Sequence, residues 1–341
     1  MNVACVVGGG SWGTAFSYHL AEAGFRVRLW IREPEICEDA VRTRENRVFL
    51  PGRVFPESAS FHNDLKDAAA GADTVFIAVP SIHFRKVYTR LAEFLRPDAG
   101  VISLTKGIEK RSLLRMSEII ASVSLPAGRI RIGVLSGPSF AQEAAGGHPT
   151  GLVMASTDAE LARCIQTCAS NEYWRIYTSR DLVGVEIGGA LKNIIAIAAG
   201  LSDGMNFGFN SRAALMTRGL VEISRLGTKL GAKPETFSGL AGMGDLVLTC
   251  TGPLSRNRHV GLELGQGRRL ADILAGMKGL AEGIPTTVSA RQLARRENID
   301  LPITEQVYQV LYRRKDPRRA MTDLMTRTLK DENESSGSEK P

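Results

Sequence analysis

The chain has 341 residues, of which 43% are hydrophobic and 23% charged, and its formal net charge is +7. This length is long for one domain and predicts two. The positive charge is spread along the chain, which suits an anionic small substrate or a nucleotide, and no long block of lysine and arginine with interleaved aromatic residues indicates nucleic acid.

A glycine-rich turn follows the first predicted strand. Val3–Val7 is a short apolar run, and a helical pattern follows over Thr14–Ala23. Between them Gly8, Gly10 and Gly13 have the spacing G-x-G-x-x-G. The first glycine allows a tight turn, the second lets the backbone approach a pyrophosphate, and the third lets the helix pack on the strand. This arrangement predicts a dinucleotide bound at the helix N-terminus.

The same residues also contain a literal G-x-S-x-G, formed by Gly9, Ser11 and Gly13. That pattern can mark the nucleophile of a hydrolase. We reject this alternative because the hydrolase turn belongs deep in a sheet that is already built, whereas this one follows the first strand.

The second predicted strand, Val27–Trp30, leads to Arg32 and Glu33. They lie about 20 residues after the glycines, at the position that reads the adenosine ribose. Glu33 suits the 2′-hydroxyl of NAD, and Arg32 suits the 2′-phosphate of NADP. The choice between the cofactors therefore stays open, and an exposed loop pair is the alternative.

Strands and helices continue to alternate, which predicts a doubly wound α/β fold with a mostly parallel sheet. The further predicted strands are Thr74–Val79, Val101–Leu104, Ile132–Leu135 and Gly151–Ala155, and the predicted helices are His83–Leu95 and Ser112–Ser122.

Ligands of such a sheet lie at the carboxyl ends of its strands. The segments 79–81, 105–107 and 137–141 fall there. We therefore expect Lys106 at the site, although a solvated loop lysine is the alternative.

The pattern becomes helical after about Asp181. The segment Val185–Gly200 is apolar almost all round but carries Lys192, followed by Asn193. Burial disfavours a charged lysine, so this one either serves a function or extends along the helix to water. Further helices are predicted over Ser211–Leu230, Pro285–Glu297, Thr304–Tyr312 and Pro317–Leu329.

Polar residues stand in glycine-rich loops of this helical half. Asp245 follows a run of glycines, with Thr249 one helical turn later. Ser255 is a candidate N-cap, and Arg256 and Asn257 after it make an anion site at a helix N-terminus. The alternatives are a turn or cap role for the aspartate and a solvated face for the arginine. Glu282 lies in another glycine-flanked loop, between Gly279 and Gly283, and the sequence does not determine its role.

The cysteines and histidines are scattered, without C-x-x-C or H-E-x-x-H, which predicts neither a disulfide framework nor a metal site. No apolar run reaches membrane-span length without a charge, and the N-terminus enters a strand at once. We therefore expect a cytoplasmic protein without stable membrane insertion. The expected division is residues 1–180 for the nucleotide-binding domain, 181–330 for an all-α substrate domain, and 331–341 for a disordered tail.

Together these motifs resemble the bacterial type of NAD(P)-dependent glycerol-3-phosphate dehydrogenases. The resemblance covers residues 2–330 and is carried by GGGSWGTA (8–15), TKG (105–107), SGPSFA (136–141), GVEIGGALKN (184–193), GMGDLVLTC (242–250) and SRNRH (255–259). It implies a Rossmann domain followed by an all-α domain, usually in a homodimer. The implied reaction interconverts sn-glycerol 3-phosphate and dihydroxyacetone phosphate with NAD(P)(H), for phospholipid synthesis.

The resemblance also implies roles for individual residues. Lys192 would be the proton acceptor, assisted by Lys106, Asp245 and Thr249. The substrate contacts would be Lys106, Gly137, Ser139, Lys192, Asn193, Asp245, Ser255, Arg256 and Asn257. The cofactor contacts would be Gly8, Gly10, Ser11, Trp12, Gly13, Arg32, Glu33, Lys106, Ala141, Arg256, Leu280 and Glu282.

Two alternatives stay open. One is a related dehydrogenase that acts on another hydroxy acid or sugar acid, and the other is a nucleotide-sensing protein without catalysis. The paired lysines and aspartate favour an enzyme, because a sensor does not need them.

Overall fold

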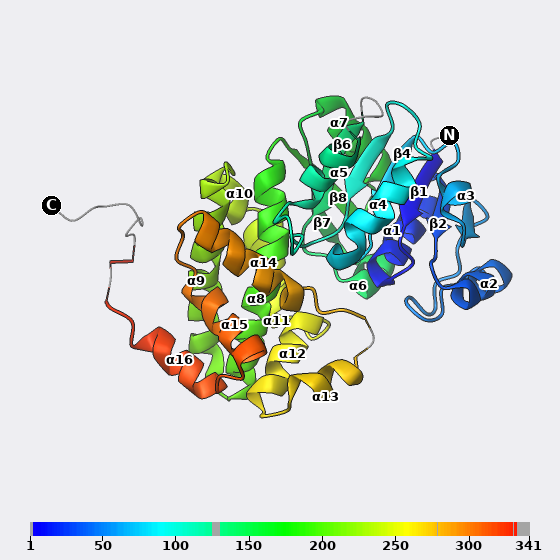
Figure 1. Ribbon diagram of the computed structural model, residues 1–341. Helices are drawn as coiled ribbons and strands as arrows, with labels where there is room; N and C mark the ends of the chain where they lie inside the picture. The colour runs from blue at the N-terminus through cyan, green and yellow to red at the C-terminus, as the bar shows by residue number, and fades with distance from the viewer. Residues whose placement is uncertain (1–2, 125–129, 278, 330, 333–341) are drawn as a thin grey trace.

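The computed structural model describes residues 3–124, 130–277, 279–329 and 331–332 (Figure 1). The first half of the chain builds an eight-stranded sheet with the strand order β3-β2-β1-β4-β5-β6-β7-β8. The strands are β1 (Val3–Val7), β2 (Arg26–Trp30), β3 (Ala59–His62), β4 (Thr74–Ile77), β5 (Gly100–Ser103), β6 (Arg131–Ser136), β7 (Thr150–Ser156) and β8 (Trp174–Ser179).

The sheet is parallel except where β6 pairs antiparallel with β7. The register sets Val7 of β1 beside Ile77 of β4, and Ile77 beside Ser103 of β5. The carboxyl ends of these central strands therefore lie side by side. The segments that follow β1, β4 and β5 contain Gly8, Ser81 and Lys106. These residues therefore lie at the same edge of the sheet.

Helices cover both faces of the sheet. Phe16 and Leu20 of α1 join one core layer with α7, and Phe84 and Ile119 belong to the opposite layer with α3. Both layers are apolar, which stabilises a sheet that is buried on its two faces. The helices of this half are α1 (Ser11–Glu22), α2 (Pro34–Thr43), α3 (Leu65–Ala69), α4 (Phe84–Ala92), α5 (Met116–Ser124), α6 (Ala141–Ala145) and α7 (Ala159–Ala169), with the 3₁₀ turn η1 (Ser81–His83).

The second half is helical, as predicted, and begins with the long helix α8 (Leu182–Gly204) (Figure 1). By length and composition α8 could cross a membrane, but 89% of its most apolar stretch is buried inside the protein, so it is a core helix. The other elements are α9 (Gly208–Lys229), α10 (Pro234–Ser238), the π-helical turn η2 (Leu240–Gly244), α11 (Asp245–Thr251), α12 (Arg256–Gly265), α13 (Leu270–Ala275), α14 (Gly283–Arg296), α15 (Pro302–Arg313) and α16 (Pro317–Met325).

Glycines let α12 cross α8 in direct backbone contact. A Cβ added at Gly261 of α12 would lie 2.0 Å from the Ile197 carbonyl oxygen, and one at Gly200 of α8 would lie 2.1 Å from the Arg258 carbonyl oxygen. Only glycine permits this approach. The crossing brings the N-terminus of α12 beside the middle of α8.

The fold class is confirmed, with differences in detail. The sequence reading missed the edge strands β3 and β8. Helix α5 begins at Met116 rather than at Ser112, because Arg115 instead forms an isolated bridge with Ile108. The glycine-rich stretch before Asp245 was expected to be a loop and is the π-helical turn η2. Most of the expected disordered tail lies outside the described residues.

Candidate active site

The glycine turn has the shape that a dinucleotide needs. Gly8 has a φ of 126°, and a Cβ at Gly13 would lie 2.0 Å from the Gly8 carbonyl oxygen, so both positions require glycine. Nothing lies within 4 Å of a Cβ built at Gly10. No side chain caps the first turn of α1, which begins at Ser11. Its backbone N–H groups are left for an anion such as a pyrophosphate, so the residues present fit NAD(P).

Arg32 and Glu33, which the sequence predicts to contact the adenosine ribose, do not distinguish NAD from NADP in the structure. Arg32 Nε donates to Glu33 Oε1 over 2.9 Å, and the arginine side chain is largely exposed. The two groups neutralise each other at the end of β2. Trp12 lies beside the glycine turn. It also stacks on Trp174 of β8 with ring centroids 5.8 Å apart, and so helps hold α1 against the sheet.

One buried carboxylate joins the two predicted lysines. Lys192 Nζ of α8 donates to Asp245 Oδ1 and, over 2.7 Å, to Thr249 Oγ1. Lys106 Nζ, from the loop after β5, donates to Asp245 Oδ2 over 2.6 Å. The Thr249 hydroxyl donates to the Asp245 carbonyl over 2.6 Å. The structure thus brings together residues from both halves of the chain.

Burial lowers the proton affinity of the Lys192 amine. Lys192 is 5% exposed, and its removal from water lowers its pKa to about 8. Asp245 opposes this shift and Lys106 adds to it. A pKa near 8 lets one amine both accept and donate a proton close to neutral pH. The shift has the direction that the apolar helix predicts.

Lys106 is also fixed by the turn after β6. Its Nζ donates to the Gly137 carbonyl over 3.1 Å, and Ser139 Oγ donates to the same oxygen over 3.0 Å. Gly137 has a φ of 140°, and a Cβ there would meet the Gly151 carbonyl oxygen at 2.8 Å. This glycine is therefore needed to turn the carbonyl toward Lys106. Ala141 begins α6 directly after this turn.

The start of α12 holds Ser255, Arg256 and Asn257, which the sequence predicts as an anion site. Ser255 is the predicted N-cap, and its hydroxyl accepts from Arg258 N over 3.2 Å. Arg256 is exposed as a residue, but partial burial of its guanidinium lowers the pKa, and the guanidinium makes no hydrogen bond within the described part of the chain. Asn257 Nδ2 donates to Asn193 Oδ1 over 2.9 Å, and Asn257 Oδ1 accepts from Gly283 N over 2.8 Å. Asn257 thereby links α12 to α8 and α14.

Glu282 and Leu280 precede α14, and the glutamate reaches the sheet half. Its Oε1 accepts from Ser81 N over 3.0 Å, and its Oε2 accepts from Ser81 Oγ over 2.6 Å. Burial raises the pKa of Glu282, whereas these bonds and Arg256 lower it. The sequence indicated that Ser81 lies at the strand ends but did not indicate its partner.

Two polar residues near the site were not identified from the sequence. Asn46 is buried and donates to the Gly9 carbonyl over 2.8 Å, which holds the glycine turn. Glu186, within the apolar segment of α8, is a second buried charge. The sequence signal that could have identified Glu186 is an acidic residue within an otherwise apolar helical segment.

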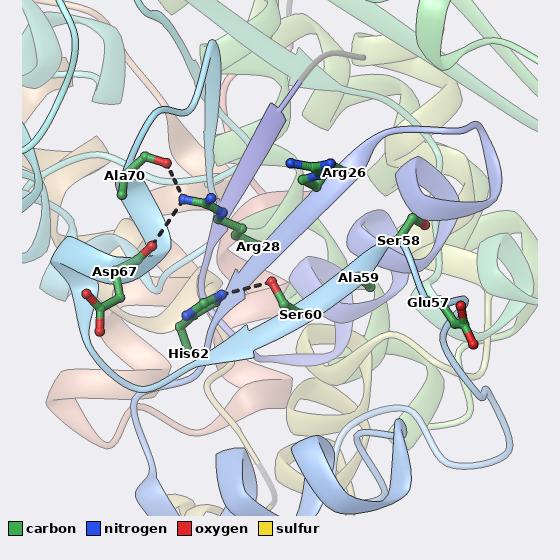
Figure 2. A pocket seen from close by; sticks show the side chains of 9 residues that line it. All are labelled: Arg26, Arg28, Glu57, Ser58, Ala59, Ser60, His62, Asp67 and Ala70. Atoms are coloured by element: carbon green, nitrogen blue, oxygen red, sulfur yellow. Dashed lines mark hydrogen bonds between the residues drawn. The ribbon is translucent and has the colours of Figure 1, made fainter.

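A hollow of about 530 Å³ lies on the β2–β3 flank of the sheet (Figure 2). Arg28 there donates to the Ala70 carbonyl, and His62 contacts Ser60 (Figure 2). It holds none of the predicted site residues. No three histidine, cysteine or acidic residues in the described ranges gather as metal ligands.

Comparison with known proteins identifies the family. Residues 3–162 match the family model described as "NAD-dependent glycerol-3-phosphate dehydrogenase N-terminus". Residues 181–322 match the model of the C-terminus of the same family. The chain belongs to the NAD-dependent glycerol-3-phosphate dehydrogenase family. The family confirms the predicted resemblance and the class of the protein, an oxidoreductase linked to NAD(P).

Relatives of this dehydrogenase family match over nearly their whole length. The glycerol-3-phosphate dehydrogenase [NAD(P)+] of Syntrophobacter fumaroxidans is 53% identical over 96% of both chains. That of Geobacter metallireducens is 52% identical over 96% of this chain and 98% of its own. The crystal structure of glycerol-3-phosphate dehydrogenase from Coxiella burnetii is 38% identical, with a TM-score of 0.92 over 96% of this chain and 99% of that one.

Proposed function

We propose that the protein interconverts sn-glycerol 3-phosphate and dihydroxyacetone phosphate with NAD(P)(H), and that Lys192 carries the proton. The observation that carries this proposal is the buried Lys192 amine, which shares Asp245 with Lys106. The names of the relatives from Syntrophobacter and Geobacter support the substrate and the cofactor.

Oxidation of a secondary alcohol removes a hydride from carbon and a proton from oxygen. NAD(P), when bound, supplies the hydride acceptor. The neutral Lys192 amine then takes the hydroxyl proton, and in the reverse direction the ammonium gives it to the carbonyl oxygen. Lys106 polarises the same oxygen, and Asp245 holds both amines in place. Thr249 orients Lys192 through its hydroxyl.

The substrate phosphate would bind at the start of α12. Arg256 supplies an exposed cation there, and the helix dipole adds partial positive charge. Ser255 and Asn257 flank it, and Gly137, Ser139 and Asn193 would complete the substrate contacts. Binding energy at the phosphate, remote from the reacting carbon, holds that carbon in place.

We infer that the cofactor lies along the turn of Gly8, Gly10, Ser11, Trp12 and Gly13, with the nicotinamide toward Lys106. The residues proposed to contact the rest of it are Arg32, Glu33, Ala141, Arg256, Leu280 and Glu282. We also propose a cytoplasmic homodimer that serves phospholipid synthesis, in two domains that divide near residue 180. Absence of a metal stays an expectation.

The test is consumption of NADPH with dihydroxyacetone phosphate, run in parallel with NADH and with a panel of small keto acids. We expect turnover with dihydroxyacetone phosphate, and the faster nucleotide gives the cofactor preference. Turnover only with a keto acid would assign another dehydrogenase reaction. Nucleotide binding without any turnover would assign a sensor.

A further inference from the structure

The Lys192 helix has a second buried charge, Glu186, whose contacts all lead to the sheet half. Its side chain is 3% exposed. Oε1 accepts from Ser117 N over 2.8 Å, and Oε2 accepts from Ser117 Oγ over 2.6 Å and from Arg115 Nη1. Glu186 therefore caps α5 from another part of the chain. A buried carboxylate with three donors, one of them a cation, is a strong and directional contact.

Arg115 connects this contact to the loop that carries Lys106. The Arg115 backbone forms an isolated bridge with Ile108, two residues after Lys106. Ile108 packs into the core of the helical half, and its carbonyl accepts from Ser289 Oγ over 3.0 Å. The loop after β5 is thus held between α5 and the helical half.

Two routes therefore join the elements that carry the two lysines. The first runs through Asp245, which bonds to both amines directly. The second runs through Glu186, Arg115 and Ile108 and touches neither amine. Because the second route fixes α8 against the Lys106 loop, it limits how far the two amines can separate.

We propose that Glu186 is a positioning residue, which holds α8 against the loop after β5 and so sets the spacing of Lys192 and Lys106. This proposal rests on the proposed function, in which Lys192 transfers the proton. Through this spacing Glu186 acts on the reaction without touching substrate, cofactor or either amine.

The spacing controls the proton affinity of Lys192. The groups that face its amine are Asp245, Thr249 and Cys250 from α11, and Lys106 from the loop. Lys106 lowers the pKa of Lys192, whereas Asp245 raises it. If the loop moves away, the repulsion by Lys106 weakens and the pKa of Lys192 rises. Any direct electrostatic effect of losing the Glu186 charge would have the opposite sign, because removal of a negative charge lowers a lysine pKa.

The test is the pH dependence of kcat/KM for sn-glycerol 3-phosphate oxidation in Glu186→Gln. We expect the apparent pKa of the rising limb to move upward, and kcat to fall about ten- to hundredfold, the scale of a small misplacement. The KM for the nucleotide stays within about twofold, because the glycine turn is untouched. An unchanged or lowered pKa overturns the proposal.

Glu222→Gln is the matched control. Glu222 is also a buried carboxylate, and it caps α15 by accepting from Ile303 N, Thr304 N and Thr304 Oγ1, but all three donors lie in the helical half. We expect it to alter stability and leave the pH profile in place. An equal upward shift in this variant assigns the effect to general loosening and overturns the proposal.

Ser117→Ala is the second variant, for use if Glu186→Gln does not fold. It removes one of the three donors, so the same upward shift is expected at smaller size, and no shift overturns the proposal. Lys192→Ala separates the two proposals. If that variant keeps normal turnover, the proposed function fails and the positioning role fails with it. If it is inactive and the Glu186 variants keep the original profile, only the positioning role fails.

Discussion

Lys192 and Lys106 bond to the same carboxylate, yet their surroundings differ. The Lys192 side chain is 7% exposed and that of Lys106 is 20% exposed. The more enclosed amine, that of Lys192, loses more hydration, and this burial lowers its pKa to about 8. This difference supports assigning the proton transfer to Lys192 and the polarising role to Lys106.

The pKa of Lys192, lowered to about 8 by burial, predicts opposite pH profiles for the two directions. Oxidation needs the neutral amine, so its kcat/KM rises with pH up to about 8 and then levels off. Reduction needs the ammonium, so its kcat/KM is level below about 8 and falls above it. Initial rates in both directions from pH 6 to 10 measure this. Parallel profiles would contradict the role of the lysine.

Arg256→Ala tests the proposed phosphate contact. A charge-assisted hydrogen bond contributes about 1.5–3 kcal/mol, so kcat/KM for dihydroxyacetone phosphate should fall about ten- to hundredfold. Dihydroxyacetone, which lacks the phosphate, is the comparison substrate; at saturating NADPH, which offsets any loss of the proposed Arg256–cofactor contact, its much lower kcat/KM should hardly change. Equal losses on both substrates would be inconsistent with a phosphate contact.

At the scale of elements, the crossing of α8 and α12 places the proposed phosphate site beside Lys192. Gly200 and Gly204 of α8 face Gly261 and Gly265 of α12, in a four-residue spacing on both helices. Larger residues would separate the helices and move Ser255 away from Lys192.

Gly261→Ala should therefore cost stability. The added Cβ would lie 2.0 Å from a backbone carbonyl oxygen that cannot rotate away. We expect the free energy of unfolding to fall by about 1–3 kcal/mol, measured by urea denaturation. Gly276→Ala is the matched control, since its nearest contact would be at 3.8 Å, and it should change stability by less than about 0.5 kcal/mol. Equal stability of the two variants would refute the close crossing.

At the scale of the whole molecule, polar contacts between the sheet half and the helical half surround the proposed site. Asp245 binds Lys106, Glu186 binds Ser117, and Glu282 binds Ser81. Each contact joins a carboxylate of the helical half to a donor of the sheet half. The two halves thus meet at the edge where the strands end (Figure 1).

Ser81→Ala should weaken nucleotide binding. It removes one donor from Glu282, a proposed cofactor contact that joins η1 to the start of α14. We expect the Kd for NADPH to rise about tenfold, equivalent to about 1.4 kcal/mol. Fluorescence titration measures this, with Ser60→Ala on the β2–β3 flank as the control. An unchanged Kd for NADPH would show that the Ser81–Glu282 hydrogen bond does not contribute to nucleotide binding.

The sequence predicted the parts of the fold and site that depend on local pattern. The glycine spacing identified the nucleotide turn, and a lysine in an apolar helix indicated the amine. Contacts across the chain were not predictable in this way, because Ser81 and Glu282 are separated by 201 positions. Edge strand β3 has four residues, Ala59–His62, so its alternation of apolar and polar residues is too short to predict a strand. Gly239 to Gly244 suggested a loop, since glycine is unfavourable in helices, but packing against α8 holds the segment as a π-helical turn.

The most direct measurement is single-turnover reduction of dihydroxyacetone phosphate by Lys192→Ala, with NADPH binding measured on the same protein. Acid–base catalysis contributes on the order of 100-fold or more, so the rate should fall by at least that factor while the Kd for NADPH stays near that of the unaltered protein. A near-normal rate with intact NADPH binding would contradict the proposal that Lys192 carries the proton.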